Sequence, residues 1–317
     1  MSEPLEFEQQ AVQRMLARER LGIDLFDKGR TTFLSHFGAW QSLVVGPWIA
    51  HKELVMALAL ANLSPNQRSS LAKTLIVEWG RTFGVGRLEL EALPSGLPLG
   101  GSSLALRSRA GEGPSVLYTW GLGPGAQARE CDWLLLRAQP EWALDESPRA
   151  MSARGMETLT GIGGRVVVFL PSATAAKQVA DLMGKRVPMH AHPRFSPQLE
   201  PEHLDPNADL WLWPTDQYKS PRLRDQVLST GSMVSVKTSE RRLLERWAGD
   251  RPKLELVDAA CPGRFDRAAL LNFWRECGEP RVLLRGESEW AKPGAAWLES
   301  QGVQVSRQSN AAQISLF

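Results

Sequence analysis

Continuous apolar runs alternate with helical patterns through the second half of the chain, and this alternation constrains the fold more than any other feature of the sequence. Buried strands are expected at 165–170, 210–213, 254–257 and 281–284. Helices are expected at 173–183, 266–277 and 289–301, the first of them capped by Ser172. Strand–helix alternation of this kind predicts a layered α/β protein.

The first half of the chain contains helical patterns followed by short strands. Residues 52–62 form a helical pattern that stops at Ser64 and Pro65, and a second helix is expected from there to about Glu78. Further strands are expected at 88–93, 103–107, 115–119 and 133–136. The second and third of these flank a Gly-rich turn, which predicts a hairpin.

The composition excludes several classes of protein. Hydrophobic residues make up 43% of the 317 residues and charged residues 23%, which is ordinary for a soluble globular protein. The formal net charge of +2 is too small to indicate nucleic-acid binding by itself, so such binding needs a local patch. The sequence has no signal-peptide pattern and no apolar run that could span a membrane, so no membrane partner is expected. The cysteines, Cys131, Cys261 and Cys277, have neither metal-like spacing nor an even number, which favours a reducing cytoplasm.

Several segments, in the same order along the chain, resemble the metallo-β-lactamase fold with an inserted β-CASP domain. That family includes ribonuclease J, the mRNA 3′-end cleavage subunits and a bacterial DNA exonuclease associated with ligases. T-F-L-S-H at 32–36 is similar to the strand that enters the family's H-x-H-x-D-H metal loop, and L-P-S-G-L-P-L-G-G-S at 93–102 is similar to its P-A-G-H-x-L-G-S turn. The other segments that carry the resemblance are 47–53, 116–119, 164–172, 229–233, 256–267 and 283–287.

The resemblance, which runs from about residue 22 to 305, implies a specific architecture. It implies an αββα sandwich of the metallo-β-lactamase type, formed by residues 1–150 and 252–306. A small β-CASP-like α/β domain is expected at 151–251. Residues 307–317 are expected to form a flexible tail.

The residues that bind metal in the family are largely missing from this chain. Active members hold two zinc ions through His and Asp side chains, and a bridging water becomes the nucleophile. At the aligned positions only His36 remains, and the replacements are Gly38, Trp40, Gln41, Leu97, Gly121, Arg137, Arg264 and Arg285. Glycine and leucine offer no ligand atom, and arginine stays cationic. The resemblance therefore predicts no bound metal, no cofactor, no catalytic residue and no nuclease activity.

Three of the replacements are arginines, and this suggests a different use for the site. The resemblance implies that Arg137, Arg264 and Arg285 converge where the metal ions are held in active relatives. Guanidinium groups suit phosphate oxygens, so the three side chains could bind phosphate or nucleic acid. The alternative is that they pair with carboxylates and fill an empty cavity.

The last five residues form a separate motif. Gln313, Ile314, Ser315, Leu316 and Phe317 resemble the Q-L-S/D-L-F peptide with which bacterial replication and repair proteins dock on the sliding clamp. The resemblance implies that the side-chain amide of Gln313 forms hydrogen bonds at the mouth of the clamp pocket. Leu316 and Phe317 would then be buried in the apolar cleft of that pocket. A polar run at 306–310 precedes the motif and suits a flexible tether. A last strand, or a frayed end with chance hydrophobics, is the alternative reading.

The two resemblances together predict a catalytically inactive β-CASP homologue that serves as an adaptor in bacterial DNA replication or repair. Its expected partners are the sliding clamp, an active nuclease, ligase or helicase of the same pathway, and DNA. One alternative is a hydrolase with a relocated site at His36, His51 or the pair His190 and His192. Another is an RNA-processing scaffold in which the tail matters little.

Overall fold

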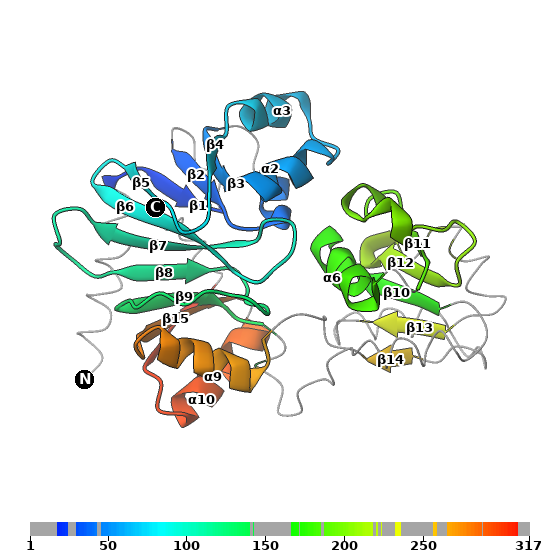
Figure 1. The fold of residues 1–317 in the computed structure, drawn as a ribbon. Coiled ribbons are helices and arrows are strands. Elements are labelled where there is room, and N and C mark those ends of the chain that lie inside the picture. The colour runs from blue at the N-terminus through cyan, green and yellow to red at the C-terminus, as the bar shows by residue number, and fades with distance from the viewer. Residues whose placement is uncertain are drawn as a thin grey trace. The chain divides into compact units, whose positions relative to one another are not determined.

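The chain is a mixed α/β protein with several sheets, described here from a computed structural model (Figure 1). The structure describes residues 18–24, 30–42, 46–139, 142, 166–170, 172–184, 187–217, 220, 223, 232–235, 256–258, 265–286 and 288–309. The chain divides into two compact units. Unit 1 comprises Met1–Glu146 with Arg264–Phe317, and unit 2 comprises Ser147–Gly263.

The smaller sheet of unit 1 has four parallel strands in the order β1-β2-β3-β4. These are β1 (Leu21–Ile23), β2 (Thr31–Leu34), β3 (Trp48–His51) and β4 (Leu75–Val77). Helices α2 (Lys52–Ala59) and α3 (Pro65–Ala72) connect β3 to β4. Helix α3 begins after Ser64, as the sequence predicts, and the structure adds that Ser64 and Gln67 form a capping box with Pro65 in the first turn.

The larger sheet of unit 1 has seven strands in the order β16-β15-β9-β8-β7-β6-β5. Its strands are β5 (Thr82–Val85), β6 (Leu88–Pro94), β7 (Ser102–Ser108), β8 (Val116–Thr119), β9 (Trp133–Arg137), β15 (Arg281–Gly286) and β16 (Val305–Ser309). Strands β5 to β8 are antiparallel neighbours, which confirms the predicted hairpin of β7 and β8. Strands β8, β9, β15 and β16 are parallel, so their carboxyl ends lie at one edge of the sheet.

The two sheets of unit 1 face each other across a shared apolar core. Leu21, Phe33 and Ile49 of the smaller sheet belong to the same buried cluster as Leu104 and Leu135 of the larger one. A second cluster lies on the other face of the larger sheet, where α9 (Arg267–Glu276) and α10 (Ser288–Ser300) cover it. Unit 1 is therefore built in layers, with apolar side chains on both faces of its larger sheet.

Unit 2 contains one parallel sheet with the strand order β11-β12-β10-β13-β14. Its strands are β10 (Val166–Leu170), β11 (Met189–Ala191), β12 (Leu210–Pro214), β13 (Ser232–Ser235) and β14 (Leu256–Asp258). Helix α6 (Ala173–Met183) follows β10, and the side chain of Ser172 caps it by accepting from Ala175 N, which confirms the predicted cap. Strand β10 is buried along its whole length, as expected for the centre of a parallel sheet.

Three sequence predictions need correction. The second helix ends at Ala72, and Leu75–Val77 is strand β4, because this short apolar run pairs with β3. Strand β14 pairs with β13 and belongs to the sheet of unit 2, so the chain returns to unit 1 at Arg264 instead of residue 252. The polar run after Val305 is strand β16 and is no flexible tether.

The third correction follows from the position of β16 at the edge of its sheet. Main-chain pairing needs no apolar side chains, and β16 pairs with β15 in a register that places Arg307 beside Leu284. An edge strand has a neighbour on one side only, so polar residues are tolerated there. Residues 310–317, including the predicted clamp motif, lie outside the described residues.

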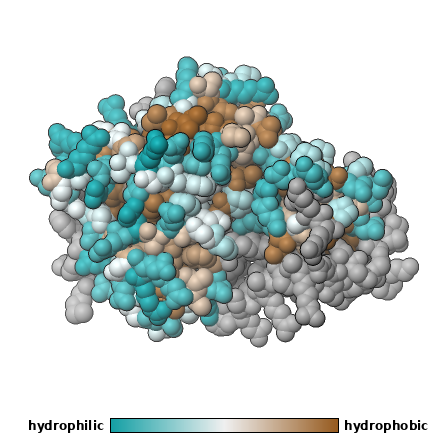
Figure 2. All heavy atoms as spheres, in the orientation of Figure 1, coloured by the Kyte–Doolittle hydropathy of each residue, from teal (hydrophilic) through white to brown (hydrophobic). Residues whose placement is uncertain are grey.

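An exposed apolar surface lies over α2 and β4 on the face drawn in Figure 2. Met56 and Leu60 of this region are exposed, as are Leu75 and Ile76. Strand β4 ends the four-stranded sheet, and none of the described strands pairs with its outer edge. In the described part of the chain, no helix is long and apolar enough to cross a membrane.

A tight turn after β6 depends on glycine at position 96. Gly96 has φ +74°, and a Cβ there would collide with the carbonyl group of Gly123, whose amide donates to Ser95. Gly111 has a similar φ of +71°, but a Cβ there would meet no heavy atom within 4 Å. A comparison of these two positions therefore separates the cost of backbone strain at positive φ from the cost of steric collision.

We expect Gly96→Ala to destabilise unit 1 by about 3 kcal/mol or more, because strain and collision add. Gly111→Ala should cost about 1 kcal/mol from strain alone. Denaturant titration of both variants measures the difference. Equal losses for the two variants would contradict the close approach of Gly96 to Gly123.

Candidate functional site

The candidate site lies where the carboxyl ends of β2, β8, β9 and β15 meet in unit 1. Ser35 and His36 follow β2, and Trp120 follows β8. Arg137 ends β9, and Arg285 lies near the end of β15. Ligand sites of α/β proteins form most often at the carboxyl ends of parallel strands.

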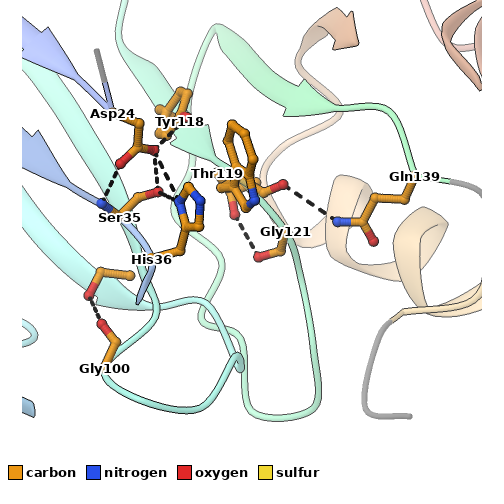
Figure 3. Close-up of polar contacts among 10 residues, drawn as sticks. Asp24, Ser35, His36, Gly100, Tyr118, Thr119, Gly121 and Gln139 are labelled. Carbon is orange, nitrogen blue, oxygen red and sulfur yellow. Dashed lines mark hydrogen bonds and ion pairs between the residues drawn. The ribbon is translucent and has the colours of Figure 1, made fainter. Parts of the chain in front are cut away.

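A buried carboxylate forms the inner wall of the site (Figure 3). Asp24 accepts hydrogen bonds from Ser35 N at 2.7 Å, from Ser35 Oγ and from the Tyr118 hydroxyl at 2.8 Å. His36 Nδ1 lies 3.5 Å from Asp24 Oδ2. Asp24 follows β1 with φ 55°, a conformation that aspartate tolerates better than most residues. The carboxylate therefore connects both sheets of unit 1, because Tyr118 belongs to β8.

The surroundings of Asp24 determine the protonation states of Asp24 and Tyr118. Burial alone would raise the pKa of Asp24, but the charge and hydrogen bond of His36 and the bonds from Ser35 lower it below its ordinary value. Burial, followed by the charge and hydrogen bond of Asp24, raises the pKa of Tyr118 well above its ordinary value. Asp24 is thus an anion at neutral pH, and the neutral Tyr118 donates to it.

The indole of Trp120 contacts both His36 of the buried network and Arg137. The rings of His36 and Trp120 stack with centroids 4.1 Å apart and an interplanar angle of 12°. The guanidinium carbon of Arg137 lies 3.8 Å from the centre of the Trp120 ring, which is the geometry of a cation–π contact. Trp120 therefore orients both the His36 imidazole and the Arg137 guanidinium at this edge.

Arg137 and Arg285 are direct neighbours on adjacent parallel strands. Their Cα atoms are partners in the register of β9 and β15, and Ala138 N donates to Arg285 O. Burial lowers the pKa of Arg285, whereas the charges of Tyr118 and Asp24 oppose that shift. A guanidinium remains charged at neutral pH even so. The structure therefore brings these two predicted site residues together, and Arg264 lies outside the described residues.

Neighbouring side chains fill the space beside Gly121, where the sequence resemblance leads us to expect a bridging metal ligand. A Cβ at Gly121 would lie 2.8 Å from Gln139 Nε2 and 3.1 Å from Leu97 Cδ1, so no aspartate fits there without rearrangement. Gln139 is 3% exposed, and its Nε2 lies 3.5 Å from Trp120 O. A Cβ at Gly38 would in turn lie 3.3 Å from the His36 ring. The donor set present here does not fit a two-zinc centre.

The other histidines considered in the sequence analysis, His51, His190 and His192, pack against aromatic rings. His51 stacks on Trp79 at 3.8 Å, and burial lowers its pKa. In unit 2, His190 lies 4.4 Å from Trp211, and His192 contacts Trp213 edge-on at 4.6 Å. Across the part of the chain that the structure describes, no three His, Cys, Asp or Glu side chains gather closely enough to hold a metal ion.

Sequence reasoning missed Asp24, Tyr118, Trp120 and Gln139. Asp24 and Tyr118 lie far apart in the chain, and no local pattern indicates that they meet. Trp120 follows a strand that the sequence predicts, so a search of residues after strand ends would have found it. The same search would have found Gln139, since it lies two residues after the end of β9.

Comparison with known proteins identifies a fold and no function. The chain matches no protein-family model and no curated protein. It is similar to a crystal structure described as a protein of unknown function from Enterococcus faecalis V583, with a TM-score of 0.55 and 14% sequence identity. The match covers 89% of this chain and 80% of that chain. Agreement over this length shows a shared α/β arrangement.

The pKa of Asp24 generates a test of the buried network. Because the folded state lowers this pKa, the stabilisation by ionised Asp24 is complete above about pH 4 and is lost as pH falls through the folded-state value. Near neutral pH, Asp24→Asn should lower the free energy of unfolding by about 3 kcal/mol, since it breaks a buried charged network. The deficit should shrink as pH falls below 4.

Tyr118→Phe is the matched control, measured by denaturant titration across the same pH range. It removes one hydrogen bond to the carboxylate and should cost about 2 kcal/mol, while the pH dependence of the wild type persists. An Asp24→Asn variant with the pH profile of the wild type would show that Asp24 is not the titrating anion.

Proposed function

We propose that the chain is a non-catalytic relative of the β-CASP nucleases that links the bacterial sliding clamp to nucleic acid. The paired arginines at the carboxyl ends of β9 and β15 are the main support for this proposal. They occupy positions where the family resemblance expects metal ligands. The layered arrangement of unit 1 and the parallel sheet of unit 2 suit a metallo-β-lactamase-like sandwich with a β-CASP-like insertion.

The charges at this edge favour an anionic ligand. The charges of Arg285 and the buried Asp24 carboxylate act on each other, and the oxygens of Asp24 already accept bonds from Ser35 and Tyr118. The Arg137 guanidinium lies over the face of the Trp120 ring, which holds its positive charge at this edge of the sheet. A phosphate group supplies acceptors of matching geometry and charge. Phosphate binding would use the site without any hydrolytic chemistry.

Strand β16 brings the expected clamp-binding motif near the two arginines. Ser309 is the last residue of β16 and is in register with Gly286, directly after Arg285. Residues 310–312 separate Ser309 from Gln313. A chain extends at most about 3.6 Å per residue, so Gln313 stays within roughly 14 Å of Ser309. A clamp that binds QISLF would therefore lie close to the arginine edge.

The proposed docking indicates which partners to test. The sliding clamp encircles DNA, and an adaptor held at its surface would present Arg137 and Arg285 to the phosphate backbone. A nuclease, ligase or helicase of the same pathway would be the enzyme recruited by such an adaptor. The hydrolase alternative finds no support in the stacked histidines, and the RNA-scaffold alternative is separated below by nucleic-acid preference.

Calorimetric titration against a bacterial sliding clamp tests the tail. The full chain should bind with a dissociation constant on the order of micromolar, as short docking peptides do. A chain ending at Ala312 should lose this binding completely, and Phe317→Ala should weaken it at least about tenfold, because Phe317 is an expected anchor. Equal binding by the full and shortened chains would remove the motif from the proposal.

Nucleic-acid titration tests the arginine pair. The double variant Arg137→Gln/Arg285→Gln should bind DNA at least about tenfold more weakly. The salt dependence of its affinity should show that about two fewer counterions are released on binding. The matched control is Arg81→Gln/Arg107→Gln, which changes two exposed arginines that pair with Glu78 and Glu89 on the surface. Adding Arg264→Gln to the double variant tests the third predicted residue.

Three outcomes are informative. DNA affinity that is equal in the wild type and the double variant would favour the structural reading, in which the arginines fill a cavity. An RNA preference that survives removal of the tail would favour the RNA scaffold. Clamp affinity should be the same in the double variant, since Arg137 and Arg285 are not part of the peptide.

A further inference from the structure

Two cysteines of unit 1 lie side by side at the opposite end of the larger sheet from the arginine edge. Cys131 precedes β9, and Cys277 follows α9 as its C-cap. Cys131 N donates to Cys277 O at 3.1 Å, and the two thiols are hydrogen-bonded to each other. Both side chains are unoxidised thiols in the structure.

The turn after α9 holds Cys277 in this position. Gly278 and Glu279 both have positive φ, at 84° and 56°, and Glu279 N donates to Trp274 O. The Trp274 indole donates to Pro280 O at 2.8 Å and closes the turn. These contacts fix the backbone on the Cys277 side, so little rearrangement is needed to bring the sulfur atoms together.

The two thiols differ in accessibility and in acidity. Cys131 is partly exposed and lines a surface cavity of about 780 Å³ together with Asp132, Trp274 and Arg281. Cys277 is buried. The hydrogen bond from Cys131 lowers the pKa of Cys277, and a bond from the amide of Arg129 acts in the same direction against the effect of burial. One sulfur is therefore open to a small oxidant, and the other is a favourable nucleophile.

We propose that Cys131 and Cys277 are a modification site, where a peroxide converts the two thiols into a reversible disulfide. When the pair loses one proton, the other is shared in the hydrogen bond between the two sulfurs, because that bond raises the pKa of Cys131 and lowers the pKa of Cys277. As this proton passes to the Cys277 sulfur, the more exposed Cys131 sulfur attacks a peroxide oxygen, the O–O bond breaks, and the hydroxide that leaves combines with the proton lost first to give water. The Cys277 sulfur then attacks the Cys131 sulfur, the S–S bond forms, and the oxygen leaves as water. In total, two thiols lose two hydrogen atoms and the peroxide becomes two waters.

The disulfide would close a covalent loop that contains all of unit 2. All of unit 2, Ser147–Gly263, lies between the two cysteines in the sequence. A cross-link across so long a segment removes many conformations from the unfolded chain and stabilises the fold. The inference is independent of clamp and nucleic-acid binding.

The test is peroxide treatment of the Cys261→Ser variant, which removes the remaining cysteine, followed by peptide mapping without reduction. We expect one linked peptide pair containing positions 131 and 277, a mass lower by about 2 Da and complete loss of free thiol. The melting temperature should rise by about 5 °C and return after treatment with dithiothreitol.

Cys131→Ser in the same background is the control, because this partly exposed position should tolerate serine. It should show no linkage and no gain in melting temperature. Oxidation of Cys131 to sulfinic acid without a linked peptide would overturn the proposal. In the otherwise unchanged chain, linkage of either cysteine to Cys261 in preference to each other would also overturn it.

Discussion

The site depends on the hydrogen bonds and the charge of the buried Asp24 carboxylate. It is buried between the two sheets of unit 1 and accepts bonds from residues of both. A buried anion is costly unless it is fully hydrogen-bonded and paired, and Ser35, Tyr118 and His36 supply those contacts here. The network fixes the orientation of His36, and the stacking of His36 on Trp120 extends that order to Arg137.

The space and the charge at these strand ends are set by neighbouring side chains. Leu97 and Gln139 occupy the space beside Gly121, so a carboxylate side chain at position 121 would need them to move. Arg137 and Arg285 add fixed positive charge at the neighbouring strand ends. Fixed guanidinium groups hold an anion without activating water, which suits binding better than hydrolysis.

The continuous apolar strands of both units were predictable because burial on both faces leaves a local pattern. Val166–Leu170 and Trp133–Arg137 are examples. Strand β4 was mistaken for the end of a helix because three residues are too few to display a period. Strand β16 was mistaken for a tether because its stability comes from main-chain pairing with β15 and not from apolar side chains.

The site was predictable only in part for a related reason. Arg137 and Arg285 were found through a family resemblance that places them at strand ends, and the register of β9 and β15 brings them together. Asp24 and Tyr118 meet through the packing of two sheets, which no local pattern encodes. Gln139 acts by filling space beside Gly121, and such a role depends on three-dimensional neighbours that a single sequence does not reveal.

If unit 1 binds the clamp and nucleic acid together, its affinity should differ between a free clamp and a clamp loaded on a primer–template. We expect the full chain to bind the loaded clamp at least about tenfold more tightly than the free clamp, because the second contact is intramolecular. This gain in affinity should disappear in Arg137→Gln/Arg285→Gln, while binding to the free clamp is unchanged. Equal affinity for free and loaded clamps, or a gain that the double substitution leaves intact, would show that unit 1 does not bind both partners at once.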